Sequence, residues 1–177
     1  MQYREAHLSD WHELVVLHKR MDKEEKALGC VVLHPASDWF IFEKLEDPQT
    51  RWWVAEHDEM IEAFAYGTLN GTNLELQNVF VHPTWRHHGV AREMLSRLFA
   101  ERRVKSATAF VLKGNIYMSF WTTLGFRAIR ELVNAYEMKL DFATQRRNVR
   151  QGLKLRFPES DSRLVEHARN PAIGSLR

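Results

Sequence analysis

Cysteine is almost absent from this 177-residue sequence, and long apolar runs are missing. The single cysteine, Cys30, excludes an internal disulfide framework and is typical of a reducing compartment, so we expect a cytoplasmic protein. No stretch approaches the roughly 20 apolar residues that a membrane-spanning helix needs. The first residues also lack the basic and apolar pattern of a secretory signal. These absences predict a protein without membrane association.

A strong net charge is lacking too, since the whole chain carries only +2, but the charges are unevenly distributed. Residues 1–85 contain 7 basic and 15 acidic residues, a net charge of −8. Residues 86–140 have a net charge of +6, and residues 141–177 have one of +4. An acidic first half followed by a basic second half indicates two kinds of ligand.

The length and the apolar periodicity predict one compact α/β domain. A chain of this size needs no metal or disulfide to complete its core. Apolar spacing predicts the element order β-αα-βββ-α-β-α-ββ, which is typical of a mixed sheet flanked by helices. The expected strands are 2–7, 51–56, 60–69, 73–81, 107–112, 127–130 and 133–140, and the expected helices are 10–26, 38–45, 89–103 and 115–123.

Local signals define the ends of several elements. Ser9 or Asp10 is expected to cap the first helix, with Glu13 completing a capping box if the cap is Asp10. The segment His57-Asp58-Glu59 predicts a hairpin turn, and Asn70-Gly71 predicts a second turn. These turns divide residues 51–81 into three strands.

The segment 73–101 is the most informative, because a strand is followed by a short loop with Gly89 and then by a strongly amphipathic helix. Such a junction directs several backbone N–H groups and the positive helix end toward one point, which suits a phosphate. Gly89 would let the ligand approach the backbone closely. The basic residues of the junction are Arg86, His87, His88 and Arg92. The sequence matches neither a Walker A loop nor a dinucleotide-binding fingerprint.

The loop Arg86-His87-His88-Gly89-Val90-Ala91 resembles the Arg/Gln-x-x-Gly-x-Gly/Ala pyrophosphate loop of the GNAT N-acetyltransferase superfamily. As in that family, a strand ending in Val-x-Pro precedes the loop, here Val81-His82-Pro83. Asn115 and the segment 120–126, which ends in Gly-Phe, resemble the family's second signature. The element order matches over residues 2–140. We therefore expect a domain spanning 1–140 and a basic C-terminal extension, 141–177, that is partly helical or loose.

The resemblance implies an acetyl-CoA-dependent acetyltransferase with a mixed, mostly antiparallel central sheet. It implies that the pantetheine arm binds along the strand and that the pyrophosphate binds at the loop and helix start. The implied cofactor-binding residues are Phe80, Val81, Arg86, His87, His88, Gly89, Val90, Ala91, Arg92 and Asn115. For Arg86 and Arg92 the alternative is a solvated helix start. No metal is expected, because the spacing of the nearby histidines matches no common zinc site.

Direct attack on a thioester requires a neutral amine, so a base has to remove a proton from an alkylammonium. Glu75 lies eleven residues before Arg86, a spacing similar to that of the glutamate base in histone-type family members. Regular strand alternation would place Glu75 on one face with Gln77, Val79 and Val81. The alternative is an ordinary exposed strand glutamate.

Two further catalytic roles come from the resemblance. A backbone N–H near Val81 is the implied donor to the oxyanion. The tyrosine that often protonates the leaving thiolate in the family is replaced here by Trp121, whose indole is not a usable acid. Tyr117, one helical turn earlier, is the candidate acid, and the alternative is that Tyr117 only packs.

The acidic first half favours a cationic acceptor, namely a small amine, a lysine side chain or a protein N-terminus. An alternative function is that of a GNAT-like sensor or partner domain that binds acyl-CoA with little transfer, which the absence of a tyrosine at position 121 supports. A third is an acetyltransferase acting on charged tRNA through the basic cluster 146–156. For that cluster a solvated appendage or a dimer contact is favoured over nucleic acid. Dimers are common in the family, so a homodimer is one expected state, and the oligomeric state stays open.

Overall fold

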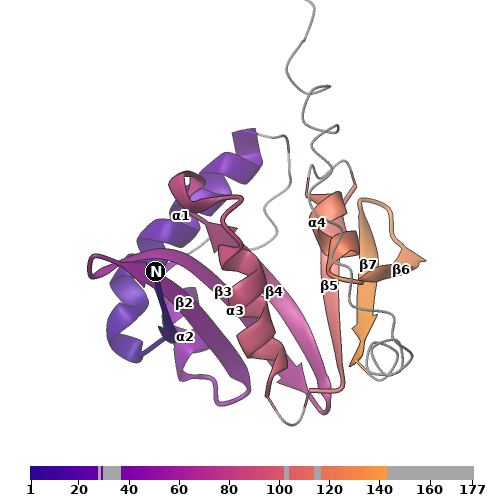
Figure 1. Ribbon diagram of the computed structural model, residues 1–177, viewed down its shortest axis with the longest axis horizontal. Helices are drawn as coiled ribbons and strands as arrows, with labels where there is room; N and C mark the ends of the chain where they lie inside the picture. Colours follow the sequence, from indigo (N-terminus) through magenta and orange to yellow (C-terminus); the bar gives the residue numbers. More distant parts are fainter. Residues whose placement is uncertain (28, 30–36, 102–103, 114–116, 143–177) are drawn as a thin grey trace, which may run out of the picture.

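The computed structural model describes residues 1–27, 29, 37–101, 104–113 and 117–142. Within them, a seven-stranded sheet has the order β1-β2-β3-β4-β5-β7-β6 (Figure 1). The strands are β1 (Gln2–Glu5), β2 (Thr50–His57), β3 (Met60–Asn70), β4 (Asn73–Val81), β5 (Ser106–Leu112), β6 (Arg127–Glu131) and β7 (Ala135–Asp141). The helices are α1 (Trp11–Ala27), α2 (Asp38–Glu46), α3 (Val90–Phe99) and α4 (Met118–Thr123), with short 3-10 helices η1 (Leu8–Asp10) and η2 (Pro83–Trp85).

Neighbouring strands are antiparallel throughout this sheet, except that β4 and β5 run parallel. The predicted fold class and element order are therefore confirmed. None of the described helices is long and apolar enough to cross a membrane.

Two tight turns arrange β2, β3 and β4 as an antiparallel meander. At the first, Asp58 and Glu59 have φ values of 49° and 64°, as a two-residue hairpin turn of the primed type requires. At the second, Gly71 has a φ of 62°, which glycine adopts at little cost. Both turns lie where the sequence predicts them.

The sheet separates two apolar clusters. Helices α1 and α2 cover one face, where the buried residues of the α1-side core are Leu14, Val15, Leu17, Met21, Ile41, Trp52, Val54, Ile61, Phe64, Tyr66 and Phe80. Helix α3 covers the other face, and the largest buried residues of its α3-side core include Leu74, Met94, Leu95, Leu98, Phe126 and Met138. With both faces covered, the central strands hold their side chains in fixed positions on each side of the sheet.

Two predicted helices have different bounds in the structure. The helix expected at 89–103 ends at Phe99, and its last buried residue is Leu98. Glu101 instead forms an ion pair with Arg51 of β2, with the Nε and Oε2 atoms 3.2 Å apart. The helix expected from position 115 begins at Met118. Asn115, like all of the extension beyond Phe142, lies outside the described residues.

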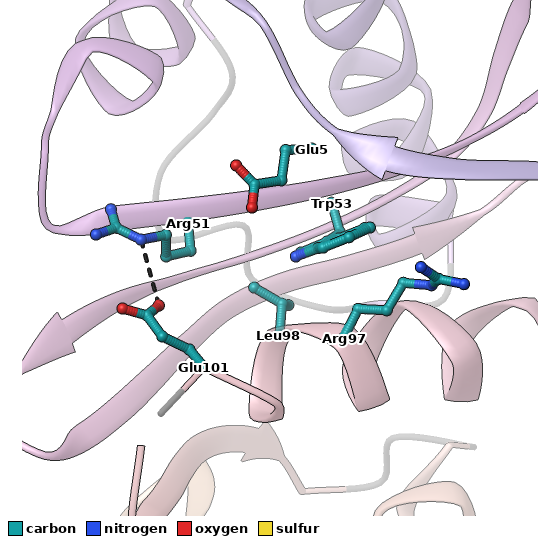
Figure 2. Close-up of a pocket in the computed structure, with 6 residues that line it drawn as sticks. All are labelled: Glu5, Arg51, Trp53, Arg97, Leu98 and Glu101. Carbon is teal, nitrogen blue, oxygen red and sulfur yellow. Dashed lines mark ion pairs between the residues drawn. The ribbon is translucent and has the colours of Figure 1, made fainter. Parts of the chain in front are cut away.

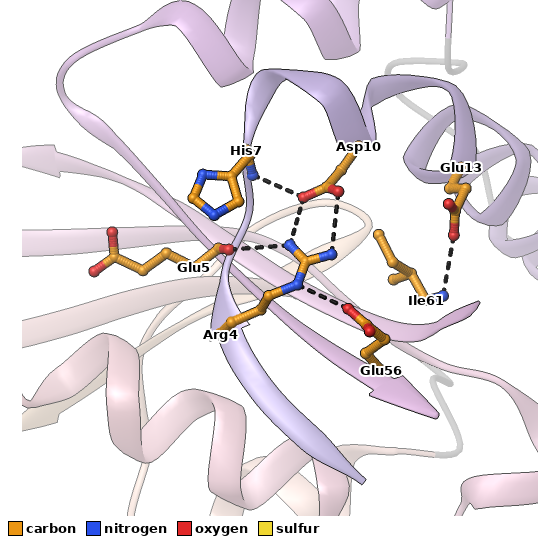
Figure 3. A network of polar contacts seen from close by, with 7 residues as sticks. All are labelled: Arg4, Glu5, His7, Asp10, Glu13, Glu56 and Ile61. Atoms are coloured by element: carbon orange, nitrogen blue, oxygen red, sulfur yellow. Dashed lines mark hydrogen bonds and ion pairs between the residues drawn. The ribbon is translucent and has the colours of Figure 1, made fainter. Parts of the chain in front are cut away.

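The predicted capping box at the start of α1 is wrong, because the carboxylates concerned have other partners (Figure 3). Asp10 ends η1, where its Oδ2 accepts the His7 backbone N–H at 2.7 Å. Arg4 donates to both Asp10 oxygens, at 2.7 and 3.1 Å, and to Glu56 at 2.8 Å. Glu13 accepts the Ile61 backbone N–H at 3.1 Å. These contacts join β1, η1 and α1 to the β2–β3 hairpin, which explains why long-range partners replace the local cap.

Candidate functional site

Strands β4 and β5 are paired over only part of their length. Hydrogen-bonded register joins Asn73–Leu76 to Ser106–Ala109 and stops there. The remainder of β4, residues 77–81, has no register partner on β5, and the two strands run apart (Figure 1). We call residues 77–81 the open edge of β4. In an otherwise continuous sheet, this is where backbone donors and acceptors become accessible to a ligand.

The open edge begins with a β-bulge. Tyr66 of β3 pairs with Asn78, whereas the next residue, Gly67, pairs with Leu76. Gln77 is therefore an extra residue on β4. Such a bulge leaves one residue outside the ladder and shifts the side-chain alternation beyond it.

The bulge changes which side chains share a face. Leu76 belongs to the α3-side core, and after the bulge Val79 and Val81 pack against that same core. Phe80 instead belongs to the α1-side core. Since strand neighbours alternate, Glu75 lies on the face opposite to Leu76. The expected common face of Glu75 with Val79 and Val81 is therefore wrong, because regular alternation does not continue through a bulge.

The ladder also determines where the open edge directs its backbone groups. The His82 N–H donates to the Glu62 carbonyl at 2.8 Å, and Val81 stands opposite Ala63. In an antiparallel pair, bonded and non-bonded residues alternate, so Val81 directs its N–H and C=O away from β3. Val79, two residues earlier in the same register, does the same. These two residues present the backbone groups of the open edge toward the β5 side.

Phe80 stands between them and faces the other way. It pairs with Phe64 across the ladder, and its ring is buried in the α1-side core. The Arg86 guanidinium carbon lies 5.6 Å from the centre of that ring. The structure therefore turns the backbone of Phe80 toward β3, and the residue that accompanies Val81 at the open edge is Val79.

Beyond the open edge, the loop before α3 turns through two left-handed residues. His87 has a φ of 65° and Gly89, the N-cap of α3, has one of 80°. The first helical bond runs from the Glu93 N–H to the Gly89 carbonyl at 3.0 Å, so the preceding N–H groups lie before the helical ladder begins. A Cβ built on Gly89 would meet no atom within 4 Å. An open space thus lies in front of the helix start, as an anion site requires.

Basic groups surround this space. The side chains of His87, His88 and Arg92 are exposed, and the His88 ring Nδ1 donates to the Arg86 carbonyl at 2.8 Å. Because the positive end of α3 points to the same place, the field there favours a negatively charged ligand. The residues around the loop therefore fit a diphosphate.

Arg86 is held by protein partners from several elements. Its Nε donates to the Val81 carbonyl at 2.8 Å, and a terminal nitrogen forms an ion pair with Glu24 of α1. Its other terminal nitrogen lies 3.5 Å from the Tyr117 hydroxyl. Arg86 thus connects α1, the end of β4 and the residue that precedes α4.

The two candidate catalytic side chains lie at different ends of the open edge. Glu75 is half-buried on the paired part of β4, opposite Thr108 of β5, and its Oε1 accepts from Gln77 at 3.2 Å. Tyr117 is the N-cap of α4 and, through Arg86, lies near the Val81 end. At roughly 3.3 Å per residue, six strand residues span up to about 20 Å. The structure therefore does not bring Glu75 and Tyr117 together.

Comparison with known proteins identifies the domain. Residues 48–128, from the end of α2 to the start of β6, match the family model of the acetyltransferase (GNAT) domain. The match covers 81 of the 177 residues, and this part of the chain is similar to a GNAT acetyltransferase domain. The resemblance based on the loop before α3 and on the Gly-Phe signature is thus confirmed, and with it the prediction of an acetyl-CoA-dependent acetyltransferase.

Solved structures share the fold of this GNAT domain. PaiA N-acetyltransferase from Thermoplasma acidophilum, in complex with coenzyme A, has a TM-score of 0.71 at 14% identity, covering 79% of this chain and 98% of that chain. A putative acetyltransferase from Salmonella typhimurium with acetyl-CoA has a TM-score of 0.64 at 19% identity, covering 80% and 93%. The ribosomal-protein-S18-alanine N-acetyltransferase from Escherichia coli has a TM-score of 0.63 at 16% identity, covering 79% and 92%. No curated protein matches the sequence.

The described fold also contains a buried polar group that the sequence did not predict. His18 and Asp22 of α1 are only 1% and 6% exposed, and Asn78 of β4 lies 3.0 Å from the His18 ring and 3.2 Å from the Tyr66 hydroxyl. Burial and the neighbouring Asp22 raise the pKa of Glu25 on the same helix. In the sequence, His18 falls within the apolar stripe of α1, and an aspartate follows one turn later. A histidine on the apolar face of a helix with an aspartate one turn away is the sequence signal for such a buried polar pair.

A hollow of about 330 Å³ lies between the C-terminal end of α3 and strands β1 and β2 (Figure 2). It is lined by Glu5, Arg51, Trp53, Arg97, Leu98 and Glu101. None of these residues belongs to the open edge of β4 or to the loop before α3. The hollow therefore lies apart from the candidate site of the GNAT domain. Among the described residues, no three His, Cys, Asp or Glu side chains gather as metal ligands.

Proposed function

We propose that this domain transfers the acetyl group of acetyl-CoA to a primary amine by direct attack with general-base assistance. The observation that carries the proposal is the open edge of β4 leading to the N-terminus of α3. The open edge suits the extended, amide-containing arm of acetyl-CoA, and the helix N-terminus suits its diphosphate. When bound, acetyl-CoA supplies the acetyl group as an activated thioester.

The diphosphate is held at the start of α3. Val90 and Ala91 offer backbone N–H groups in the first turn, Arg92 supplies positive charge, and the exposed rings of His87 and His88 offer N–H groups. Gly89 keeps the space in front of these groups open. Asn115, which lies outside the described residues, stays a predicted contact from the resemblance.

The pantetheine arm lies along the open edge of β4, where its amides pair with the backbone groups of Val79 and Val81 as an added strand would. The Val81 carbonyl already accepts from Arg86, which leaves the Val81 N–H as the donor toward the arm or the thioester oxygen. A backbone N–H directed at developing negative charge lowers the barrier by about 3 kcal/mol.

Glu75 is the proposed general base. It is half-buried and adjacent to the bulge at which β4 leaves β5. An alkylammonium has a pKa of about 10.4, so its proton has to be removed before attack, directly or through water. The Gln77 amide donates to the carboxylate and keeps it oriented.

Tyr117 is the proposed acid for the leaving thiolate. Its hydroxyl accepts from Arg86, and a phenol that accepts one hydrogen bond can still donate its own proton. Position 121 cannot take this role, because the Trp121 indole packs edge-on against Phe126 with their ring centres 5.3 Å apart. The thiolate needs only weak help from an acid to leave, because a thiol has a pKa of about 8.5.

The acceptor is proposed to be cationic, because residues 1–85 carry a net charge of −8. Small amines, lysine side chains and protein N-termini satisfy this condition. One structure that shares the fold is an alanine N-acetyltransferase, so an N-terminal alanine peptide belongs in the panel.

The test measures thiol release from acetyl-CoA in the presence of a panel of amines. We expect turnover with cationic amines, and less with acceptors that carry a carboxylate beside the amine. Better turnover of anionic acceptors would contradict the charge argument. Binding of acetyl-CoA without thiol release from any amine would favour an acyl-CoA-binding domain over an enzyme.

A further inference from the structure

Helix α1 buries two ionisable side chains against the sheet. His18 is 1% exposed and Asp22 is 6% exposed, and they lie one helical turn apart with the His18 Nδ1 and Asp22 Oδ1 atoms 3.4 Å from each other. The His18 ring stacks on Phe64, with ring centres 5.6 Å apart. Burial of such groups lowers stability unless their polar atoms find partners, so a retained buried pair calls for a role.

The partners of this pair lie on the strands that form the candidate site. The Asn78 amide nitrogen is 3.0 Å from the His18 Nε2 and 3.2 Å from the Tyr66 hydroxyl. An amide nitrogen only donates, so Nε2 accepts and the His18 proton is on Nδ1, facing Asp22. Burial lowers the pKa of His18, against the pull of Asp22, and raises the pKa of Tyr66 to about 12. Both groups are therefore neutral near pH 7.

Asn78 occupies a special position on β4. Leu76 is the last residue paired with β5, Gln77 is the extra residue of the bulge, and Asn78 follows it. Both amide hydrogens of Asn78 are used, one toward α1 and one toward β3. A shift of the strand by one residue would remove both bonds and would exchange the faces of every residue beyond the bulge.

We propose that Asp22, His18 and Asn78 form a positioning unit that holds the β4 bulge in register and thereby directs the N–H groups of Val79 and Val81 toward acetyl-CoA. The proposal rests on the function proposed above. None of the three residues touches the reacting atoms. Their effect on binding passes through the backbone of the open edge.

The decisive variants separate the hydrogen bond from the volume of the side chain. His18→Leu removes the acceptor, whereas His18→Gln keeps an amide oxygen that can accept from Asn78. Thr50→Val is the control, because Thr50 is 6% exposed and its hydroxyl bonds Asp47 and Thr68, neither of which takes part in the contacts among His18, Asn78 and Tyr66. His18→Leu and Thr50→Val each delete one buried polar contact of similar size, and His18→Gln preserves one.

The measurements are calorimetric titration with coenzyme A and hydrogen exchange at the Phe80 amide, which the ladder turns toward β3. We expect His18→Leu to weaken coenzyme A binding about tenfold and to accelerate exchange at the Phe80 amide. His18→Gln should recover most of the affinity. Thr50→Val should lower the melting temperature while leaving the affinity within twofold of the unmodified protein. If His18→Leu does not fold, Tyr66→Phe removes one of the two acceptors of Asn78 and should weaken binding about threefold.

Unchanged affinity and exchange in His18→Leu would overturn the proposal, and so would an equal loss of affinity in Thr50→Val. If the unmodified protein does not bind coenzyme A, the proposed function fails. The exchange rate of the Phe80 amide then still decides whether the unit controls the bulge.

Discussion

At the scale of single residues, Gly89 shows how one backbone angle creates a ligand site. Its φ of 80° ends the loop and begins α3, and no atom lies within 4 Å of the place where a Cβ would be. A side chain here therefore meets no steric contact. A side chain at this position would instead lower stability, because the backbone is left-handed, and it would weaken binding, because it would occupy space needed by a bound diphosphate.

Gly89→Ala should lower the free energy of unfolding by about 1 kcal/mol, because alanine disfavours a positive φ. It should also weaken coenzyme A binding about tenfold, because the methyl group enters the anion space. Gly71→Ala is the matched control, since Gly71 also has a positive φ and an open Cβ position but lies at the β3–β4 turn. Chemical denaturation and calorimetric titration measure the two effects. Equal affinities in both variants would refute the assignment.

Glu75→Gln should reduce kcat by about 100-fold or more, because the variant cannot accept a proton. Coenzyme A affinity should stay within twofold, since the side chain lies at the paired end of β4. Glu59→Gln, in the exposed turn between β2 and β3, serves as the control and should retain full turnover. Steady-state kinetics with a cationic amine checks both. If Glu75→Gln turned over as fast as the control, another group would have to remove the proton from the amine.

At the scale of elements, η1 is joined to β1 and β2 through Arg4 and Asp10. Burial raises the pKa of Asp10, but the hydrogen bonds from Arg4 and the His7 N–H outweigh it, and the pKa lies below its ordinary value. A carboxylate with a lowered folded-state pKa adds stability above its unfolded-state pKa of about 3.9. That contribution is lost as the pH falls through the folded-state value.

The free energy of unfolding of the unmodified protein should therefore decline as the pH falls below about 4. Asp10→Asn should be less stable at pH 6 and should show a shallower decline at acid pH, because it has no proton to gain there. Urea denaturation at pH values from 6 to 3 measures both curves. Parallel curves would mean that Asp10 has the same proton affinity in the folded and unfolded states.

The element order could be predicted from the sequence because it depends on local signals. The left-handed turn at Asp58 and Glu59 and the amphipathic pattern of α3 are contained in a few adjacent residues. The bulge at Gln77 could not be predicted, since it arises from pairing between β3 and β4 and has no local composition signal. The same limit applies to the direction of the Phe80 backbone and to the ion pair between Arg86 and Glu24, because both depend on partners far away in the sequence.

At the scale of the whole molecule, the described fold continues slightly beyond the domain boundary predicted at residue 140. The Phe142 N–H donates to the Lys105 carbonyl at 3.1 Å, and its ring lies 5.1 Å from that of Phe99. A chain of residues 1–142 should therefore unfold like the full protein and retain coenzyme A binding. A chain of residues 1–140 should lose about 2 kcal/mol of stability with the aromatic contact and the last strand pair. Equal stability of the two chains would contradict this boundary.

The uneven charge has a structural counterpart in this domain. The basic residues around the loop before α3 surround the proposed diphosphate site, and acidic residues such as Glu24 and Glu25 lie on α1, on the other face of the sheet. The proposed function therefore has the anionic cosubstrate and the cationic acceptor approach from different sides of β4.

The central claim is that acetyl-CoA occupies the open edge of β4 and the start of α3. The most direct test is residue-resolved hydrogen exchange with and without saturating coenzyme A. The account predicts slower exchange at Val79, at Val81 and at residues 87–92, with little change around the hollow beside Trp53. Protection confined to that hollow, with unchanged exchange at Val79 and Val81, would contradict it.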